Sequence, residues 1–297
     1  MERGVDLARA VAAGHGFPQD PVDAVHQRGS VNYVFIVGAG ADRFVIRFAR
    51  DPQRADEFAA ERWCAQRAAA QGIPTAEVVA VGILEGVPYG VQRFVTGKPG
   101  DSVTGSELWS ALGRYGRVIN AISADDSAPT GLFTRFGRDL PSAWNAHVEY
   151  NLGELDATDP LLRMGVYSSQ QQDRLRKTLT ELSEIPMRFG LSHGDLSIRN
   201  LLLPAGESPV LIDWGSASFG PVPLTDLLLL DRDARNAGSP SDAEFHAFAE
   251  AAGVDLEQVR GTLNAYRQLH LLDLVRWATD QRPERLDHAI DDLTSAL

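Results

Sequence analysis

The sequence predicts an α+β fold with two lobes, in which a small antiparallel sheet with one helix precedes a larger and mainly helical part. Two observations predict it. Short runs of β-branched and aromatic residues, separated by Gly-containing turns, fill most of the first part of the chain. After a segment rich in Gly and Pro at residues 96–101, the apolar residues recur with helical spacing instead. We therefore expect an N-terminal lobe over residues 1–96 and a C-terminal lobe over residues 97–297.

The first lobe opens with a short amphipathic helical pattern, which Pro18 and Pro21 bring to an end. Residues 31–37 and 43–48 are rich in β-branched and aromatic side chains, and a glycine-containing turn lies between them. This pattern predicts two antiparallel strands that form a hairpin.

One helix and two more strands complete the predicted first lobe. The strong helix formers at residues 55–71 predict the helix, and Gly72 followed by Pro74 is the expected stop signal. Residues 78–83 and 87–95 predict the strands, with a short turn between them. We expect all four strands to form one small sheet.

The second lobe is predicted to be mainly helical, with short strands only around Asp195. Residues 125–165 mix Gly, Pro, aromatic and acidic residues without a sustained period. We interpret that stretch either as an insertion that faces a substrate or as a loop of variable packing. The predicted helices cover residues 107–123, 168–184, 242–251, 256–279 and 283–297.

The composition limits the classes of partner. A net charge of -12 argues against a nucleic-acid-binding surface, which needs clustered Lys and Arg. The acidic balance suits a cationic partner, although it also serves solubility. The single cysteine, Cys64, excludes an internal disulfide, and no apolar run is long enough to span a bilayer. We expect a cytoplasmic protein, a monomer or a homodimer, that binds neither nucleic acid nor membrane.

The most informative stretch of the chain begins with His-Gly-Asp at residues 193–195. Asn200 follows five residues after Asp195, and Asp213 lies beyond a predicted hairpin whose first strand starts after Asn200. Pairing of the two strands brings Asn200 and Asp213 together, while Asp195 lies on the loop that leads in. These three side chains should therefore meet in one cleft.

Such a set suits phosphoryl transfer from a nucleotide. Mg²⁺ prefers oxygen ligands, and the carboxylate of Asp213 with the amide of Asn200 leaves positions free for water and phosphates. Asp195 is then left to orient an acceptor hydroxyl and to receive its proton.

The neighbours of these residues are expected to have structural roles. We expect His193 to hold the loop by hydrogen bonds to backbone groups, and Trp214 to pack in the interior. Asp226, which precedes an aliphatic run, is expected to act as a helix N-cap or as a buttress for the loop.

The first lobe offers a complementary set of groups. Alternation along residues 43–48 places Val45 and Arg47 on one face, so that Arg47 faces the cleft as a cation for phosphate and Val45 lies beside it in the nucleotide site. A glutamate on the following helix should pair with this cation, as in kinase-like sites. Glu61 is our choice, with Glu57 as the alternative.

A small-residue segment precedes the first strand. Its residues Gly29, Ser30, Val31 and Asn32 would let backbone N–H groups approach phosphates, although such residues serve equally well as turn formers. We expect Gly29, Ser30 and Asn32 to contact the nucleotide.

Together, the residues from Gly29 to Asp226 resemble the aminoglycoside phosphotransferase family, whose members share a protein-kinase-like fold with choline kinases. The resemblance implies a two-lobed fold, MgATP as the donor with GTP as an alternative, and an alcohol on a small molecule as the acceptor. It implies Asp195 as catalytic base, Asn200 and Asp213 as metal ligands, and Arg47 as the phosphate cation.

The resemblance also implies that residues 91–95 lead to the hinge that contacts adenine, and we expect Gln92, Phe94 and Val95 to line the nucleotide site. The chain departs from the family at two points. Arg47 stands where protein kinases and several relatives have Lys. Residues 196–199 lack the usual His-Pro-Gly character of the loop, which leaves the substrate class open.

We therefore predict an ATP-dependent O-phosphotransferase that acts on a hydroxylated and cationic antibiotic, most simply an aminoglycoside. A metabolic kinase for choline, homoserine or a sugar-like substrate is the alternative within the same chemistry. A kinase-like module that binds nucleotide without transfer is a further alternative. The acids that could bind substrate amines are Glu149, Glu154, Asp156, Asp159, Asp231, Asp273 and Asp280.

Overall fold

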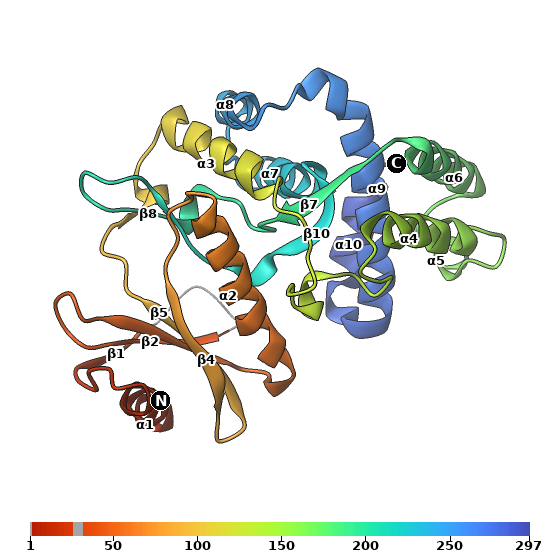
Figure 1. Cartoon of the computed structure of the whole chain (residues 1–297). Coiled ribbons are helices and arrows are strands. Elements are labelled where there is room, and N and C mark those ends of the chain that lie inside the picture. Colours follow the sequence, from red (N-terminus) through yellow and green to blue (C-terminus); the bar gives the residue numbers. More distant parts are fainter. Residues whose placement is uncertain (1, 26–31) are drawn as a thin grey trace.

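The computed structural model describes residues 2–25 and 32–297 (Figure 1). Its N-terminal part is a five-stranded antiparallel sheet in the order β1-β2-β3-β5-β4. Helix α1 lies against one face of this sheet and α2 against the other (Figure 1). The bounds are α1 Glu2–Gly14, β1 Val22–Ala24, β2 Asn32–Val37, β3 Phe44–Ala49, α2 Ala55–Ala70, β4 Val78–Leu84 and β5 Val87–Arg93.

Strand β3 alternates as the sequence predicts. Phe44, Ile46 and Phe48 are buried in the core that the sheet forms with α1. Arg47 lies on the opposite face, where its guanidinium lies 5.6 Å from the ring centre of Phe58 on α2. The one charged side chain of the strand is therefore placed between the sheet and α2.

The C-terminal part is mainly helical. It also contains two small sheets, and the loops that connect their strands include residues 193–200 and 212–217. Strands β7 and β10 form one antiparallel pair, and β6, β8 and β9 form the other sheet. The strands are β6 Lys98–Pro99, β7 Arg188–Ser192, β8 Leu201–Leu203, β9 Val210–Leu211 and β10 Ser218–Val222. The helices are α3 Ser106–Ile119, α4 Leu140–Glu154, α5 Pro160–Arg163, α6 Ser169–Glu184, α7 Leu224–Ala237, α8 Asp242–Ala252, α9 Leu256–Gln281 and α10 Leu286–Thr294.

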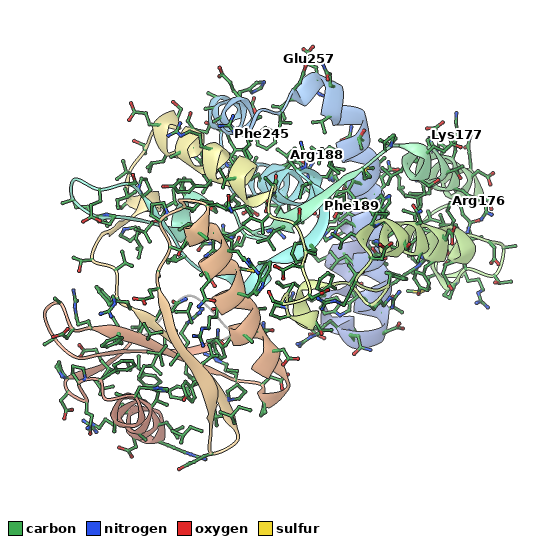
Figure 2. The ribbon with its side chains drawn as sticks, viewed as in Figure 1. Arg176, Lys177, Arg188, Phe189, Phe245 and Glu257 are labelled. Atoms are coloured by element: carbon green, nitrogen blue, oxygen red, sulfur yellow. The ribbon has the colours of Figure 1, made fainter. Side chains whose placement is uncertain are left out.

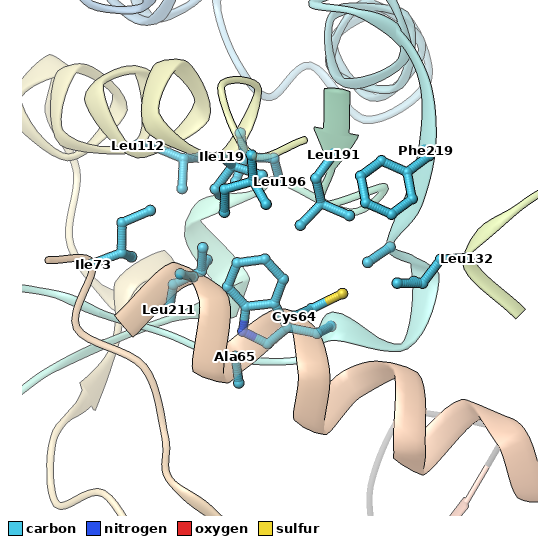
Figure 3. Packing of buried hydrophobic residues seen from close by; sticks show 14 of the residues in the cluster. Cys64, Ala65, Ile73, Leu112, Ile119, Leu132, Leu191, Leu196, Leu211 and Phe219 are labelled. Carbon is cyan, nitrogen blue, oxygen red and sulfur yellow. The ribbon is translucent and has the colours of Figure 1, made fainter. Parts of the chain in front are cut away.

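Helix α2 belongs to both parts, because its far face enters the main core of the C-terminal part. Figure 3 shows Cys64 and Ala65 of α2 packed with Leu191, Leu211 and Phe219. The backbone N–H of Leu211 also donates to the carbonyl of Pro74, just after α2, at 2.8 Å. Apolar packing thus fixes α2, and the side chains it carries, above the loops of the second part.

The fold class predicted from the sequence is confirmed. All four predicted strands of the first sheet and the single predicted helix are present within two residues of the expected bounds. The five predicted C-terminal helices are present as well, although α10 begins after a short 3₁₀ turn at Pro283–Arg285. Trp214 is buried in the main core, which confirms its predicted packing role.

The irregular stretch at 125–165 is the main correction, because it contains the 15-residue helix α4 and the short α5. Asp139 caps α4 by accepting a hydrogen bond from the N–H of Ser142, and Pro141 occupies its first turn. These are ordinary start signals. The buried side of α4 combines Ala143 and Val148 with the aromatic Trp144 and the polar Asn151, so no simple apolar period marks the helix.

Four further elements, three short strands and one helix, were also not predicted from the sequence. They are β1, β6, β10 and α7. Among the residues that the structure describes, no helix is both long enough and apolar enough to cross a membrane.

Candidate active site

The loop after β7, which carries His193 to Asn200, is held by buried polar groups. Asp226 near the start of α7 accepts a hydrogen bond from the N–H of Gly194 at 3.0 Å and one from the amide of Asn120 at 3.3 Å. Gly194 has φ +75°, and a Cβ there would lie 2.0 Å from the carbonyl oxygen of Ser216. The turn therefore requires glycine, and a carboxylate from another element fixes it.

The electrostatics of this anchor follow from burial. Burial raises the pKa of Asp226 to about 6, although the hydrogen bonds from Gly194 and Asn120 oppose that shift. His193 donates from Nε2 to the carbonyl of Ile212 at 3.2 Å, and burial lowers its pKa to about 4. His193 is therefore neutral near pH 7, and its hydrogen bond to the carbonyl of Ile212 is the predicted contact with a backbone group. Asp226 is the predicted buttress and not the N-cap of α7, which is Pro223.

Asp195 is held on both of its carboxylate oxygens. The amide nitrogen of Asn200 donates to Asp195 Oδ2 at 2.9 Å and to the carbonyl of Asp195 at 2.8 Å. The guanidinium of Arg199 donates to Oδ1. Because the nitrogen of the Asn200 amide is used in this way, its oxygen is the atom left to bind another group.

Asp213 reaches the same region from the predicted hairpin. Strands β8 and β9 pair Leu201 with Leu211, so that Asn200 and Asp213 leave the hairpin from neighbouring ends. Asp213 has φ +66°, a left-handed conformation that Asp adopts more readily than most residues. Its side chain is 55% exposed. This conformation leaves the carboxylate accessible to a ligand.

The predicted ion pair between Arg47 and Glu61 is present. The guanidinium donates to Glu61 Oε2, and both side chains are almost fully buried. A second nitrogen, Nη1, lies 3.7 Å from Asp213 Oδ1. Burial raises the pKa of Glu61, although the nearby charge of Arg47 opposes that shift. The alternative, Glu57, pairs with Arg54 instead.

These groups line one pocket of about 280 Å³ between the two parts of the chain. Gly215 forms part of its wall, and a Cβ there would lie 2.9 Å from Glu61 Oε1 and 3.6 Å from Asp213 Oδ1. The absence of a side chain at 215 keeps this space open. The pocket is lined by Asn32, Val34, Arg47, Arg54, Glu57, Glu61, Asp195, Asp213, Gly215 and Ser216.

A comparison with protein families matches residues 24–262 to the phosphotransferase enzyme family. The chain belongs to this family. The match confirms the prediction, made from the motif at residues 193–215, that the chain is a phosphotransferase.

Three solved structures of related fold are similar over almost their whole length. The apoenzyme of macrolide 2′-phosphotransferase MphH from Brachybacterium faecium gives a TM-score of 0.67 at 18% identity, over 98% of each chain. The GDP and kanamycin complex of APH(2″)-IIia gives 0.65 at 18% identity, over 93% of each. Spectinomycin phosphotransferase APH(9)-Ia, with ADP and spectinomycin, gives 0.59 at 16% identity, over 98% of this chain and 93% of its own. Comparison with curated protein sequences finds no match.

The residues present fit a divalent cation bound together with a nucleotide. Among the described residues, no three His, Cys, Asp or Glu side chains gather into a metal site of their own. The candidate oxygen donors are the accessible carboxylate of Asp213, which lines the pocket, and the amide oxygen of Asn200, whose side chain is buried and is not part of the pocket lining. Such a pair suits Mg²⁺, which keeps several waters and takes phosphate oxygens from a substrate.

Not every residue predicted for the phosphotransferase nucleotide site lies in the pocket. Gly29 and Ser30 lie outside the described residues. Val45 pairs with Gln92 across β3 and β5, and neither lines the pocket. Phe94, just past β5, lies under the guanidinium of Arg43 at 3.8 Å. The proposed adenine-binding role of Gln92, Phe94 and Val95 stays a prediction.

Two of the predicted substrate acids, the buried Asp159 and the partly exposed Asp273, accept hydrogen bonds from other side chains of the protein. Asp159 is buried, caps α5 through the N–H of Leu161, and accepts from Tyr167 and Arg276. Asp273 accepts from Asn151 at 2.9 Å and from His147 at 2.5 Å. The Asp159 prediction is therefore corrected to a structural role, because no oxygen of its carboxylate reaches a surface.

The remaining acids differ in what holds them. Asp156 closes a turn by accepting from the N–H and hydroxyl of Thr158. Asp231 pairs with Arg235 at 2.6 Å on α7. Glu149, Glu154 and Asp280 are exposed. A role of these last three in substrate binding stays a prediction.

Three residues of the site, Asn120, Arg199 and Asp233, were not predicted from the sequence. Asn120 comes from the C-terminal end of α3 and Asp233 from α7, and no local pattern signals their place. Arg199 lies four residues after Asp195 on the same loop, close enough in the chain for the two side chains to pair. That spacing was the available signal.

Replacing Asp226 with Asn tests the buried anchor through pH. Because burial raises the folded-state pKa of Asp226 from 3.8 to about 6, the folded protein retains a proton that the unfolded chain releases over that range. The free energy of unfolding of the wild type, relative to Asp226→Asn, should fall by up to about 3 kcal/mol as the pH rises from about 4 to about 6.5. Above that pH the difference should be level.

Urea unfolding of both proteins at a series of pH values measures this difference. A difference that stays constant from about pH 4 to pH 7 would contradict a buried, ionisable anchor at 226.

Proposed function

We propose that the chain is an ATP-dependent O-phosphotransferase that transfers the γ-phosphate of the nucleotide to a hydroxyl of a small antibiotic. The observation that carries the proposal is the meeting of Arg47, Glu61, Asp195 and Asp213 in one pocket between the sheet and the helical part. A cation for phosphate, an acid for metal and a proton acceptor are the groups that phosphoryl transfer needs.

The reaction that this arrangement supports is a direct displacement. The acceptor oxygen bonds to the γ-phosphorus while the bond from that phosphorus to the β–γ bridging oxygen breaks. The hydroxyl proton passes to Asp195, and the leaving nucleoside diphosphate takes the bonding electron pair. Asp195 is suited to this role because Arg199 and Asn200 already fix the direction of its carboxylate.

The other residues of the pocket bind and orient the donor. Arg47, held by Glu61, presents its charge toward the phosphates. Asp213 and the amide oxygen of Asn200 would hold the divalent cation, which neutralises phosphate charge when bound. GTP is an alternative donor, and GDP and ADP occupy two of the similar structures.

The proposed acceptor is a hydroxylated antibiotic of the aminoglycoside kind. The similar structures are named for action on, or complexed with, a macrolide, kanamycin and spectinomycin. Glu149 and Glu154 on α4 and Asp280 on α9 are exposed acids that could meet amino groups of such an acceptor.

A panel assay tests the proposed function. The wild-type protein is incubated with Mg²⁺ and γ-labelled ATP or GTP in the presence of kanamycin, spectinomycin, a macrolide, choline, homoserine or a hexose. We expect labelled phosphate on one of the antibiotics. Label on choline, homoserine or the hexose would favour the metabolic kinase, and nucleotide binding with no label on any acceptor would favour the non-catalytic module.

Two substitutions separate the proton acceptor from the metal ligand. Asp195→Asn keeps the shape of the side chain but removes the acceptor, so we expect kcat to fall by roughly a hundredfold or more with little change in nucleotide affinity. Asp213→Asn keeps the left-handed backbone but removes the charge, and should weaken binding of the Mg-nucleotide as well. Full activity in Asp195→Asn would refute the role assigned to Asp195.

Glu61 and Glu57 form a matched pair on α2. Glu61→Gln removes the charge that holds Arg47, and we expect the KM for ATP to rise by about tenfold. Glu57→Gln removes the partner of Arg54 at the same pocket but leaves the pair of Arg47 and Glu61 intact, so it should raise that KM less than Glu61→Gln does. Steady-state kinetics with ATP varied measures both, and equal effects of the two substitutions would contradict the assignment.

A further inference from the structure

Arg199 bridges the proposed catalytic base and a second acid. Its guanidinium donates from Nη2 to Asp195 Oδ1 and from Nη1 to Asp233 Oδ2, the latter at 3.1 Å. Both carboxylates hold the pKa of Arg199 above its ordinary value, although burial opposes them. The side chain is thus charged and is held at two points.

Asp233 is itself fixed in place. It lies on α7, and Arg232 donates to its other oxygen, Oδ1, at 2.9 Å and 3.1 Å. Its side chain is only 20% exposed. Helix α7 therefore holds the loop twice: Asp226 binds the backbone at Gly194, and Asp233 reaches the side chain of Asp195 through Arg199.

The chemical role of Asp195 requires a fixed carboxylate with room for one more hydrogen bond. Asn200 holds Oδ2 and Arg199 holds Oδ1, so neither oxygen can turn freely. Each oxygen has two lone pairs, and each therefore keeps one to accept the hydroxyl of the acceptor. Arginine suits this bridge because its planar fork can hold two carboxylates in fixed directions, which the point charge of lysine cannot.

The bridge contributes little to stability. The side chain of Arg199 is 47% exposed, and ion pairs at such exposure are screened by water. An effect of Arg199 on turnover should therefore be separable from an effect on folding.

We propose that Arg199 is a positioning residue for Asp195 and that Asp233 is its anchor on α7. The proposal rests on the proposed function, in which Asp195 accepts the proton of the acceptor hydroxyl. It assigns to residues 199 and 233 the task of fixing the direction of that carboxylate before the acceptor binds.

Four variants test the proposal: Arg199→Met, Arg199→Lys, Asp233→Asn and the double variant Arg199→Met with Asp233→Asn. Lys177→Met serves as control, because Lys177 lies on α6 (Figure 2) in an exposed pair with Glu181 at 3.8 Å. The acceptors are the antibiotic that reacts fastest in the panel and water, the second measured as release of labelled phosphate. Thermal melting of each variant gives the control for folding.

For Arg199→Met we expect kcat to fall by about tenfold while the KM for ATP changes less than about twofold, since the substitution disturbs the base and not the nucleotide site. Arg199→Lys should retain an intermediate kcat. The double variant should be no slower than Arg199→Met by more than about twofold, because Asp233 acts through Arg199. Melting temperatures should stay within about 3 °C of the wild type, and Lys177→Met should match the wild type throughout.

The outcomes separate this proposal from the proposed function. Wild-type kcat in Arg199→Met, with Asp195→Asn inactive, would overturn the positioning role alone. The positioning role would also be overturned if the fold-decreases in kcat from Arg199→Met and Asp233→Asn multiply in the double variant, because the two residues would then act independently. Transfer by the wild type to no acceptor of the panel and not to water would overturn the proposed function, and the positioning role with it.

Discussion

The carboxylate of Asp226 is the contact on which the geometry of the site depends. It is buried, and it joins the backbone of Gly194 on the loop, the amide of Asn120 after α3, and the start of α7. An unpaired carboxylate in that position would be costly, so both oxygens are used in hydrogen bonds. Because three elements meet at one side chain, the loop that carries Asp195 has a single position relative to the helical core.

The second constraint is the buried ion pair of Arg47 and Glu61. A buried charge without a partner would destabilise the interior by several kcal/mol, on the order of 3–5 kcal/mol for broken pairs. Arg47 and Glu61 form an ion pair where the sheet meets α2. The apolar far face of α2 then binds the C-terminal core, so that the pair is carried to the pocket with Asp213. The planar fork of arginine places one nitrogen at Glu61 and another 3.7 Å from Asp213 Oδ1.

Much of the fold follows from local pattern. Alternation in β3, the stop signals after α2 and the hairpin of β8 and β9 are each properties of a few neighbouring residues, and all three are found as expected. Helix α4 is different, because its caps are plain but its buried side is mixed with aromatic and polar residues. The helix is stabilised by packing of this mixed face against the rest of the protein, and the spacing of apolar residues in the sequence does not indicate that face.

The sequence by itself determined which chemical types of side chain are available to accept a proton, hold a cation or bind phosphate, and the local spacing that places Asn200 against Asp195 and Asp213 at the end of the hairpin. Only the tertiary structure decided which of the many other polar residues support them. Asp159 became an internal cap, while Asn120 and Asp233 joined the site from distant helices. The physical reason is that burial and pairing of a charge depend on neighbours remote in the chain, whereas the chemical type of a residue and its local spacing do not.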